Sequence, residues 1–334
     1  MNIPLTHVSK HWQSGRRGVI GLAMLALCGV TAAQDLTIGR PIKLIVGYPP
    51  GGSNDIVARI VAPRLAEALG TPVVVENKAG ANGVIGADAV AKAAPDGHTL
   101  LAASASPLVI SPHLQTSRFP FDTRKDLLAI NTLGRMPEVI AVNPSLQIST
   151  LNQLLALAKT KPVTLASSGN GGLPHLTIEL LKQASRGNIV HVPYKGAGPA
   201  VTDVIAGHTQ GIVMDLPPLY PMLQDGRLRP LAVTSDRRVE FLPKLPTAEE
   251  ELPGFQVSNW IGVFAPAKTP RAIVDKINAA MIAAMARQDV REQLQKAAVT
   301  PATLASPEAF QAFVNEEFAR WGRVVKSANV QADN

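Results

Sequence analysis

The stretch Pro41–Gly70, PIKLIVGYPPGGSNDIVARIVAPRLAEALG, decides the fold class of this chain. Its first part, residues 42–46, is an apolar run of the kind that forms a buried parallel strand. Pro and Gly residues at 49–52 end the strand, and Ser53 or Asn54 can then cap the following helix by accepting a backbone N–H bond. A helix N-terminus reached through a glycine-rich turn presents backbone amides and predicts an anion site. Neither a Walker lysine nor G-x-G-x-x-G is present, so a nucleotide is not indicated, and a carboxylate would suit the amides equally well.

The same strand–loop–helix unit recurs along the chain, which predicts an α/β fold with mainly parallel sheets. Beyond residue 70, apolar runs predict strands at 72–76, 99–103, 139–142, 163–166, 189–192, 211–214, 231–234 and 261–264. The segments between them predict helices at 84–94, 151–158, 176–183 and 199–206, and two more that begin near Pro270 and Pro307. Pro63 lies inside the first helix and is expected to kink it, because proline removes one intrahelical bond.

The middle of the chain repeats the opening scheme and so predicts a second lobe. Residues 167–175, SSGNGGLPH, form a second glycine-rich loop that leads into a helix. Two α/β lobes, each with an anion-binding loop, predict a clamshell that closes around its ligand by hinge motion. We expect the first lobe to comprise residues 36–138 and 257–334, and the second lobe residues 139–256.

The first 33 residues have the pattern of a secretory signal peptide. Basic residues at 10, 16 and 17 precede an apolar stretch, residues 18–30, which is too short to span a membrane comfortably. Small residues follow at 31–33. We therefore expect export to the periplasm with cleavage after Ala33. A retained anchor and lipidation at Cys28 stay open as alternatives.

The composition argues against several classes of function. The chain has 32 Lys and Arg against 25 Asp and Glu, and loss of residues 1–33 would remove three positive charges and lower the net charge from +7 to +4. No basic run with interleaved aromatic residues is present, so we expect no nucleic-acid partner. Cys28 is the only cysteine, so the exported chain would have no disulfide and no thiolate metal site, and we expect no cofactor.

Six motifs together make the chain similar to the substrate-binding proteins of tripartite tricarboxylate transporters, the Bug family. They are YPPGGSNDIVAR (48–59), VVVENKAGANGVIGA (73–87), PDGHTLL (95–101), SSGNGGLPHL (167–176), VPYKGAGPAVTD (192–203) and WIGVFAPAKTP (260–270). The resemblance covers residues 36–330. It implies a two-lobed periplasmic binding protein fold of type II that captures a small carboxylate (a di- or tricarboxylate, an acidic amino acid or an aromatic acid). It also implies delivery to a membrane permease, and we expect the binding protein to be a monomer.

The resemblance also implies which residues hold the ligand. They are Tyr48, Gly51, Gly52, Ser53 and Asp55 of the first loop, Ser168, Gly169, Asn170, Gly171 and His175 of the second loop, and Tyr194, Lys195 and Gly196 of the PYKG motif. Weaker candidates at the rim of the cleft are Asn77, Ala81, Ser104, Ser106 and Asp215. Gly172 departs from the family pattern, in which Ser commonly follows G-N-G, so a hydroxyl contact to the ligand would be lost.

Structural roles compete with ligand roles at three of these positions. Asp55 would stabilise the helix dipole with no ligand present. His175 could serve as a capping or core residue, and a lone Lys195 after a strand could simply be solvated. The loops at Gly51–Ser53 and Ser168–Gly171 are the strongest candidates, because bare backbone donors need no particular side chain.

Two other classes of function remain open at this point. An enzyme is disfavoured, because the chain has no H-E-x-x-H, no G-x-S-x-G and no cysteine nucleophile after residue 33. A ligand-sensing subunit that docks a membrane sensor kinase would have the same sequence features as a transport receptor, and so would the binding protein of an ABC importer.

Overall fold

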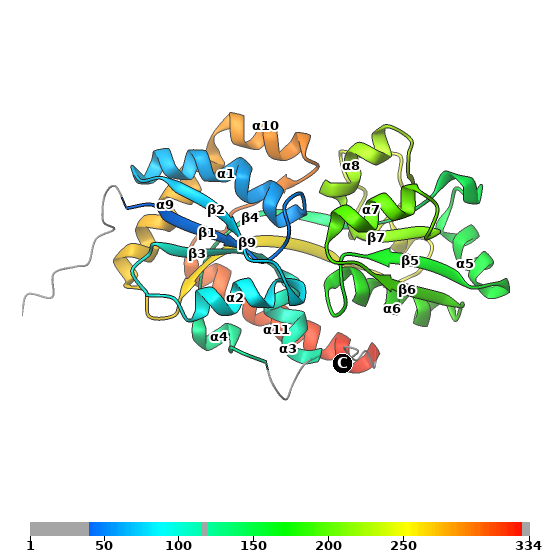
Figure 1. Cartoon of the computed structure of the whole chain (residues 1–334), viewed down its shortest axis with the longest axis horizontal. Coiled ribbons are helices and arrows are strands. Elements are labelled where there is room, and N and C mark those ends of the chain that lie inside the picture. The colour runs from blue at the N-terminus through cyan, green and yellow to red at the C-terminus, as the bar shows by residue number, and fades with distance from the viewer. Residues whose placement is uncertain (1–39, 115–118, 329–334) are drawn as a thin grey trace, which may run out of the picture. The chain divides into compact units, whose positions relative to one another are not determined.

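The computed structural model describes residues 40–114 and 119–328. The predicted signal peptide, residues 1–33, lies outside the described residues. Within them the chain forms two α/β lobes whose strands join in one path, β2-β1-β3-β9-β4-β7-β5-β6 (Figure 1). None of the helices in this described part combines the length and the hydropathy that crossing a membrane requires.

The first lobe is built on three parallel strands. These are β1 (Ile42–Val46), β2 (Val73–Asn77) and β3 (Thr99–Ser104), with β1 in the middle. On one face, β1 packs against α1 (Ser53–Leu69), α9 (Arg271–Ala286) and α10 (Gln288–Lys296). On the other face lie α2 (Val84–Ala91) and α11 (Pro307–Ala328). Two covered faces explain why the strands of this lobe are near-continuous apolar runs.

The second lobe repeats this arrangement. Its parallel strands are β5 (Val163–Ser167), β6 (Ile189–Pro193) and β7 (Gly211–Asp215), with β5 in the middle. Its larger helices are α5 (Leu151–Thr160), α6 (Leu173–Ser185), α7 (Ala197–Ile205) and α8 (Leu216–Gln224). Apolar residues of α7 and α8 pack against β7 on one face, whereas those of α5 and α6 belong to the cluster on the other.

Strand β4 (Leu127–Val142) belongs to both lobes. Its first part, to Pro137, pairs antiparallel with β9 (Ser258–Pro266) of the first lobe, and from Glu138 onward it pairs antiparallel with β7. The change of partner at Glu138 supports the proposed lobe division, which we retain. The sequence predicted only residues 139–142 as strand. Gly134 and Pro137 weaken the strand pattern before them, and register shifts at two points of β4 accommodate this irregular segment.

The parallel pattern also breaks at the junction. Strand β9 is antiparallel to both β3 and β4, β8 (Arg229–Val233) is antiparallel to β4, and β10 (Thr300–Pro301) adds a short antiparallel pair. The short elements of the described chain are η1 (Ala81–Gly83), η2 (Ser106–Ile110), α3 (Ser111–Leu114), α4 (Thr123–Asp126), η3 (Pro144–Leu146) and η4 (Ala248–Glu250).

The helices agree with the sequence in part. Helices α8 and α10 were not predicted: α8 carries three prolines, and α10 has few apolar residues. Helix α1 continues through Pro63 to Leu69. The start of α11 agrees with prediction, because Ser306 Oγ accepts the Ala309 N–H at 3.2 Å, and Phe310 and Trp321 are buried.

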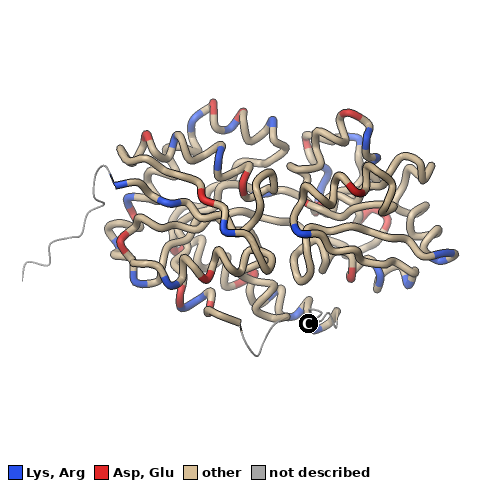
Figure 2. The backbone as a smooth tube through the Cα atoms, in the orientation of Figure 1, with Lys and Arg blue, Asp and Glu red and all other residues tan. Residues whose placement is uncertain are grey.

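Positions of acidic and basic residues are interspersed along both lobes of the described chain (Figure 2). Many form exposed ion pairs, for example Arg238 with Glu250 and Arg287 with Asp289. Such pairs contribute little to stability. The apolar clusters on the two faces of the sheet therefore hold the fold together.

Candidate functional site

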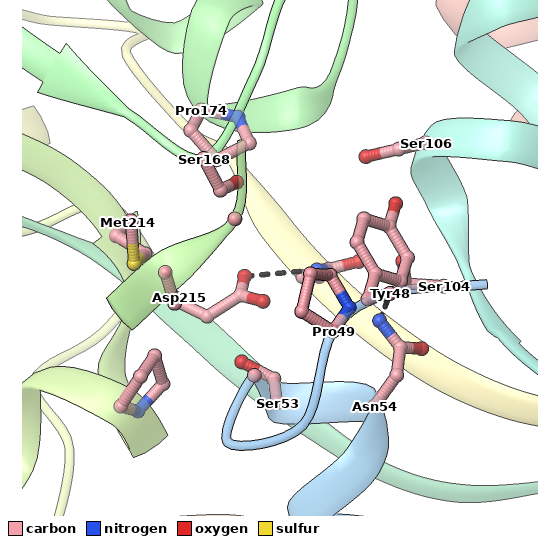
Figure 3. A pocket seen from close by; sticks show the side chains of 15 residues that line it. Tyr48, Pro49, Ser53, Asn54, Ser104, Ser106, Ser168, Pro174, Met214 and Asp215 are labelled. Carbon is pink, nitrogen blue, oxygen red and sulfur yellow. Dashed lines mark hydrogen bonds between the residues drawn. The ribbon is translucent and has the colours of Figure 1, made fainter. Parts of the chain in front are cut away.

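A pocket lies between the first loop of the first lobe and the second lobe, and we call it the inner pocket (Figure 3). It spans about 440 Å³, including space open to solvent. The first lobe lines it with Tyr48, Pro49, Gly52, Ser53, Asn54, Ser104, Ser106 and Asn259, and the second with Ser168, Pro174, Gly196, Ala197, Met214, Asp215 and Pro218. Among these described lining residues Asp215 is the one acid, and none is Lys, Arg or His.

A second hollow, the outer cavity, adjoins the inner pocket. The two share Tyr48, Pro49, Ser168 and Gly196. The outer cavity is otherwise lined by Gly47, Ala79, Gly80, Ala81, Asn82, Gly169, Asn170, Pro193, Tyr194 and Lys195. Both lobes therefore contribute to both hollows, as a clamshell that closes on a ligand requires.

The N-terminus of α1 opens into the inner pocket without a side-chain cap. The residue at the N-cap position is Gly52, in extended backbone with φ −81°, and no side chain bonds the cap. The sequence prediction that Ser53 or Asn54 caps this helix is therefore wrong. Asn54 is only 4% exposed, its Nδ2 donates to Ser104 Oγ at 3.3 Å, and its Oδ1 has no hydrogen-bond partner among the described residues. The end of the helix thus offers polar groups to the pocket that the described protein does not satisfy.

Asp55 holds the first loop in shape rather than lining the pocket. Its Oδ2 accepts the Gly51 N–H at 3.0 Å, and its Oδ1 accepts from Arg59 Nε and from Asn77 Nδ2, both at 2.9 Å. Burial would raise the pKa of Asp55, but these three hydrogen bonds together lower it. Gly51 has φ +84°, a left-handed conformation that favours glycine, and the Asp55 bond fixes the turn there.

The second loop repeats this device. Gly171 has φ +76°, and its N–H donates to Nδ1 of His175 at 3.0 Å, again four residues ahead in the chain. The His175 ring is buried, stacks on His191 with centroids 4.1 Å apart, and points Nε2 at Glu179, 3.5 Å away. His175 therefore supports the loop from below, as Asp55 does in the first lobe.

The N-terminus of α6 differs from that of α1, because the other lobe already caps it. Ser106 of the first lobe accepts the Leu173 N–H at 3.0 Å. Asn82, also of the first lobe, donates to the carbonyl of Asn170. A Cβ placed on Gly172 would come within 3.0 Å of the Asn82 Oδ1, so the glycine at this position leaves room for the Asn82 contact.

Tyr48 lies where the two hollows meet. Its hydroxyl donates to the Asn82 carbonyl at 2.7 Å, and removal of the ring from water raises the pKa of Tyr48 to about 12. Tyr194 donates to Asp203, so its hydroxyl is engaged within the second lobe. Lys195 is exposed at the rim of the outer cavity.

The thirteen predicted site residues thus fall into three sets. Tyr48, Gly52, Ser53, Ser168 and Gly196 line the inner pocket. Gly169, Asn170, Tyr194 and Lys195 line the outer cavity only. Gly51, Asp55, Gly171 and His175 line neither hollow and shape the loops instead.

Sequence reasoning did not single out Asn54, Asn259 or Glu138. Asn54 was weighed only as a helix cap, although its position beside Gly52 was a signal for the pocket. Asn259 and Glu138 had no local signal, since β9 and β4 bring them to the site from distant parts of the chain.

A pair of acids lies at the junction of the lobes. Asp215 Oδ1 accepts from Asn259 Nδ2 at 2.8 Å (Figure 3). Glu138 lies opposite Asp215 in the β4–β7 register, is fully buried, and has no hydrogen-bond partner for either carboxyl oxygen among the described residues. Burial, with the nearby Asp215, raises the pKa of Glu138 well above its ordinary value. Burial also raises the pKa of Asp215, against the opposing effect of the Asn259 bond.

Comparison with known proteins decides the family. The profile described as "Tripartite tricarboxylate transporter family receptor" matches residues 57–330. The chain belongs to this receptor family. Its members are solute-binding receptors, so the protein is a receptor and not an enzyme, as the sequence predicted.

The chain matches relatives and solved structures over most of their length. Protein BugT of Bordetella pertussis is 38% identical over 319 residues, which is 94% of this chain and 97% of BugT. The periplasmic binding protein BugD is 32% identical with a TM-score of 0.83, covering 88% of this chain and 99% of BugD. The Rhodopseudomonas palustris protein Rpa4515 with adipate is 32% identical with a TM-score of 0.83, covering 87% and 98%. MatC of the same organism, with bound malate, is 30% identical with a TM-score of 0.78, covering 86% and 99%.

Proposed function

We propose that this receptor binds a small carboxylate in the inner pocket, in the periplasm, and delivers it to a membrane permease of the tripartite tricarboxylate type. The uncapped N-terminus of α1, which opens into a pocket lined by both lobes, carries the proposal. Adipate and malate, found with two structural relatives, are both small carboxylates. The family of the chain supports the permease as the partner.

The ligand carboxylate would bind at the first turn of α1. The backbone amides of Gly52, Ser53 and Asn54 belong to the end of the helix that carries the partial positive charge of the macrodipole. The Asn54 side chain lies in the same pocket, and a rotation of its amide group would point Nδ2 at the ligand in place of Oδ1. Hydrogen bonds from such donors to a carboxylate are charge-assisted and gain strength when water is excluded.

Closure would complete the site from the second lobe. Ser168 and Gly196 line the inner pocket from that side. The contacts of Ser106 with Leu173 and of Asn82 with Asn170 already cross from one lobe to the other. They would stabilise the closed form and leave the α1 end as the open anion site.

The replacement Asn54→Asp tests the proposal. It keeps the shape of the side chain but adds a negative charge at the proposed carboxylate site. We expect binding of the best carboxylate to weaken at least about tenfold, measured by calorimetry on ligand-stripped protein, because like charges repel in a desolvated pocket. The helix itself should tolerate the acid, since acids are favourable in a first turn.

Asn152→Asp is the matched control, because Asn152 is also the second residue of a helix, is exposed, and lines neither hollow. Unchanged affinity in Asn54→Asp would remove the α1 end as the carboxylate site. Failure of every carboxylate to bind the unmodified protein would contradict the proposed function itself. Fractionation of cells that express the full chain would test the periplasmic location.

A further inference from the structure

Asp215 places a hydrogen-bond acceptor in the inner pocket. A ligand whose only polar groups are carboxylates would need hydrogen-bond donors there. Asp215 lines this pocket, and its side chain points toward the first loop, near Ser53 (Figure 3). One of its oxygens accepts from Asn259 at 2.8 Å, and hydrogen bonding with the Ser53 side chain, at the start of α1, also favours the charged form of Asp215. A carboxylate oxygen that faces a ligand attracts hydrogen-bond donors, most strongly cationic ones.

In the described chain, the lack of cationic side chains around the inner pocket strengthens this preference for a ligand with a hydrogen-bond donor. The described residues that line the inner pocket include no Lys, Arg or His. Among the described residues that line the outer cavity, Lys195 is the one cation, and it is exposed. A dicarboxylate placed wholly in the inner pocket would therefore add two negative charges beside Asp215 with only helix and loop dipoles to balance them.

Glu138 adds a second acid behind Asp215. It is fully buried, both of its oxygens lack a hydrogen-bond partner among the described residues, and it faces Asp215 across the β4–β7 register. Two neighbouring buried carboxyl groups do not both ionise readily, and Glu138, which does not line the pocket, is the one that stays protonated. Asp215 is thereby left as the charged acceptor that the ligand meets.

We propose that the inner pocket selects carboxylates that carry a hydrogen-bond donor, an ammonium or a hydroxyl group, on the carbon next to the carboxylate, and that Asp215 recognises this donor. The inference rests on the proposed function, because it takes the first turn of α1 as the carboxylate site. The first-turn residues and Asp215 line the same small pocket, so the two ligand groups they contact must be close together on the ligand. An α-amino acid or an α-hydroxy acid meets this requirement.

Matched acids test the proposal directly on refolded, ligand-stripped protein. Each series contains a parent acid, its α-amino form and its α-hydroxy form: propionate, alanine and lactate; succinate, aspartate and malate; adipate, 2-aminoadipate and 2-hydroxyadipate; 3-phenylpropionate, phenylalanine and 3-phenyllactate. In the series that binds, we expect at least one substituted acid to bind about tenfold or more tightly than its parent, as befits a charge-assisted hydrogen bond. Whether the α-amino or the α-hydroxy acid binds more tightly shows whether the recognised donor is an ammonium or a hydroxyl group.

Two variants then assign the preference to Asp215. Asp215→Asn should reduce a preference for the ammonium form over the parent acid to less than about threefold. For the hydroxyl form the corresponding variant is Asp215→Ala, since the Asn oxygen can still accept from a hydroxyl, and it should reduce that preference by the same amount. Asp225→Asn, an exposed acid of the same lobe outside both hollows, should leave the preference unchanged.

The outcomes separate the two proposals. If parent acids bind as tightly as both substituted forms, or if neither Asp215 variant alters the preference, the inference is wrong and carboxylate binding stands. If no acid of any series binds, the proposed function fails and the inference fails with it.

Discussion

Replacement of Asp55 by Asn should lower the free energy of unfolding by about 2–3 kcal/mol at pH 7, because Asp55 accepts three hydrogen bonds and is 3% exposed. An Asn side chain has one acceptor oxygen, so it can keep the Gly51 bond or the Asn77 and Arg59 bonds, but not both sets. Each buried hydrogen bond to a charged group contributes about 1.5–3 kcal/mol. The Arg59 side chain is 51% exposed, so its ion pair adds only about 0.3–0.5 kcal/mol.

The pH dependence gives a second readout of the same change. The pKa of Asp55 is lower in the folded protein than in the unfolded chain, so its contribution is present above about pH 4 and is lost as the pH falls through the folded value. The difference between wild type and Asp55→Asn should therefore shrink as the pH drops below 4. Urea unfolding followed by circular dichroism at pH 7 and at acid pH measures both effects.

Arg59→Met is the matched control for Asp55→Asn, and it should cost less than about 1 kcal/mol. A loss below about 0.5 kcal/mol in Asp55→Asn at pH 7 would refute the reasoning that Asp55 braces the loop. So would a difference from wild type that does not change with pH.

Two further changes probe the junction of the lobes. Gly172→Ser brings a Cβ within 3.0 Å of the Asn82 Oδ1 and should cost about 1–3 kcal/mol in denaturant unfolding; Asn82→Ala in the same chain should recover most of that loss, and no recovery would show that the strain lies elsewhere. Glu138→Gln should become more stable relative to wild type as the pH rises above about 4, because the raised pKa of Glu138 makes the folded wild type lose stability there, by up to about 1.4 kcal/mol per pH unit. A stability difference that stays constant from pH 4 to pH 8 would contradict a buried, protonated Glu138.

The sequence predicted those parts of the fold that depend on residues close together in the chain. The parallel strands of both lobes, the two glycine-rich loops and the helices α1 and α6 follow from apolar runs, turn residues and helix starts that lie next to each other in the sequence. Most of strand β4 was not predicted. Gly134 and Pro137 weaken its strand pattern, although the structure includes both residues in a bulged strand. Helix α8 was missed for a similar reason, since its prolines stand near its start and at Pro221.

The candidate site divides in the same way. Gly52, Ser53 and Ser168, which the sequence predicts as ligand contacts, line the inner pocket, because a loop at the carboxyl end of a parallel strand faces the cleft. Asp55 and His175 were predicted as ligand contacts, with a structural role as the alternative. The structure places both beneath their loops, where each accepts the N–H of the glycine four residues earlier.

By itself, the sequence determined the two-lobed α/β class, the resemblance to the receptor family and the positions of the two loops, since these depend on residues close together in the chain. Only the tertiary structure decided which loop end stays open: Ser106 caps α6 from the other lobe, whereas nothing described caps α1. It also decided that Asp215 meets Asn259 and lies opposite Glu138, on three strands that are far apart in sequence. Such pairings depend on sheet register and lobe packing, which no local pattern of residues specifies.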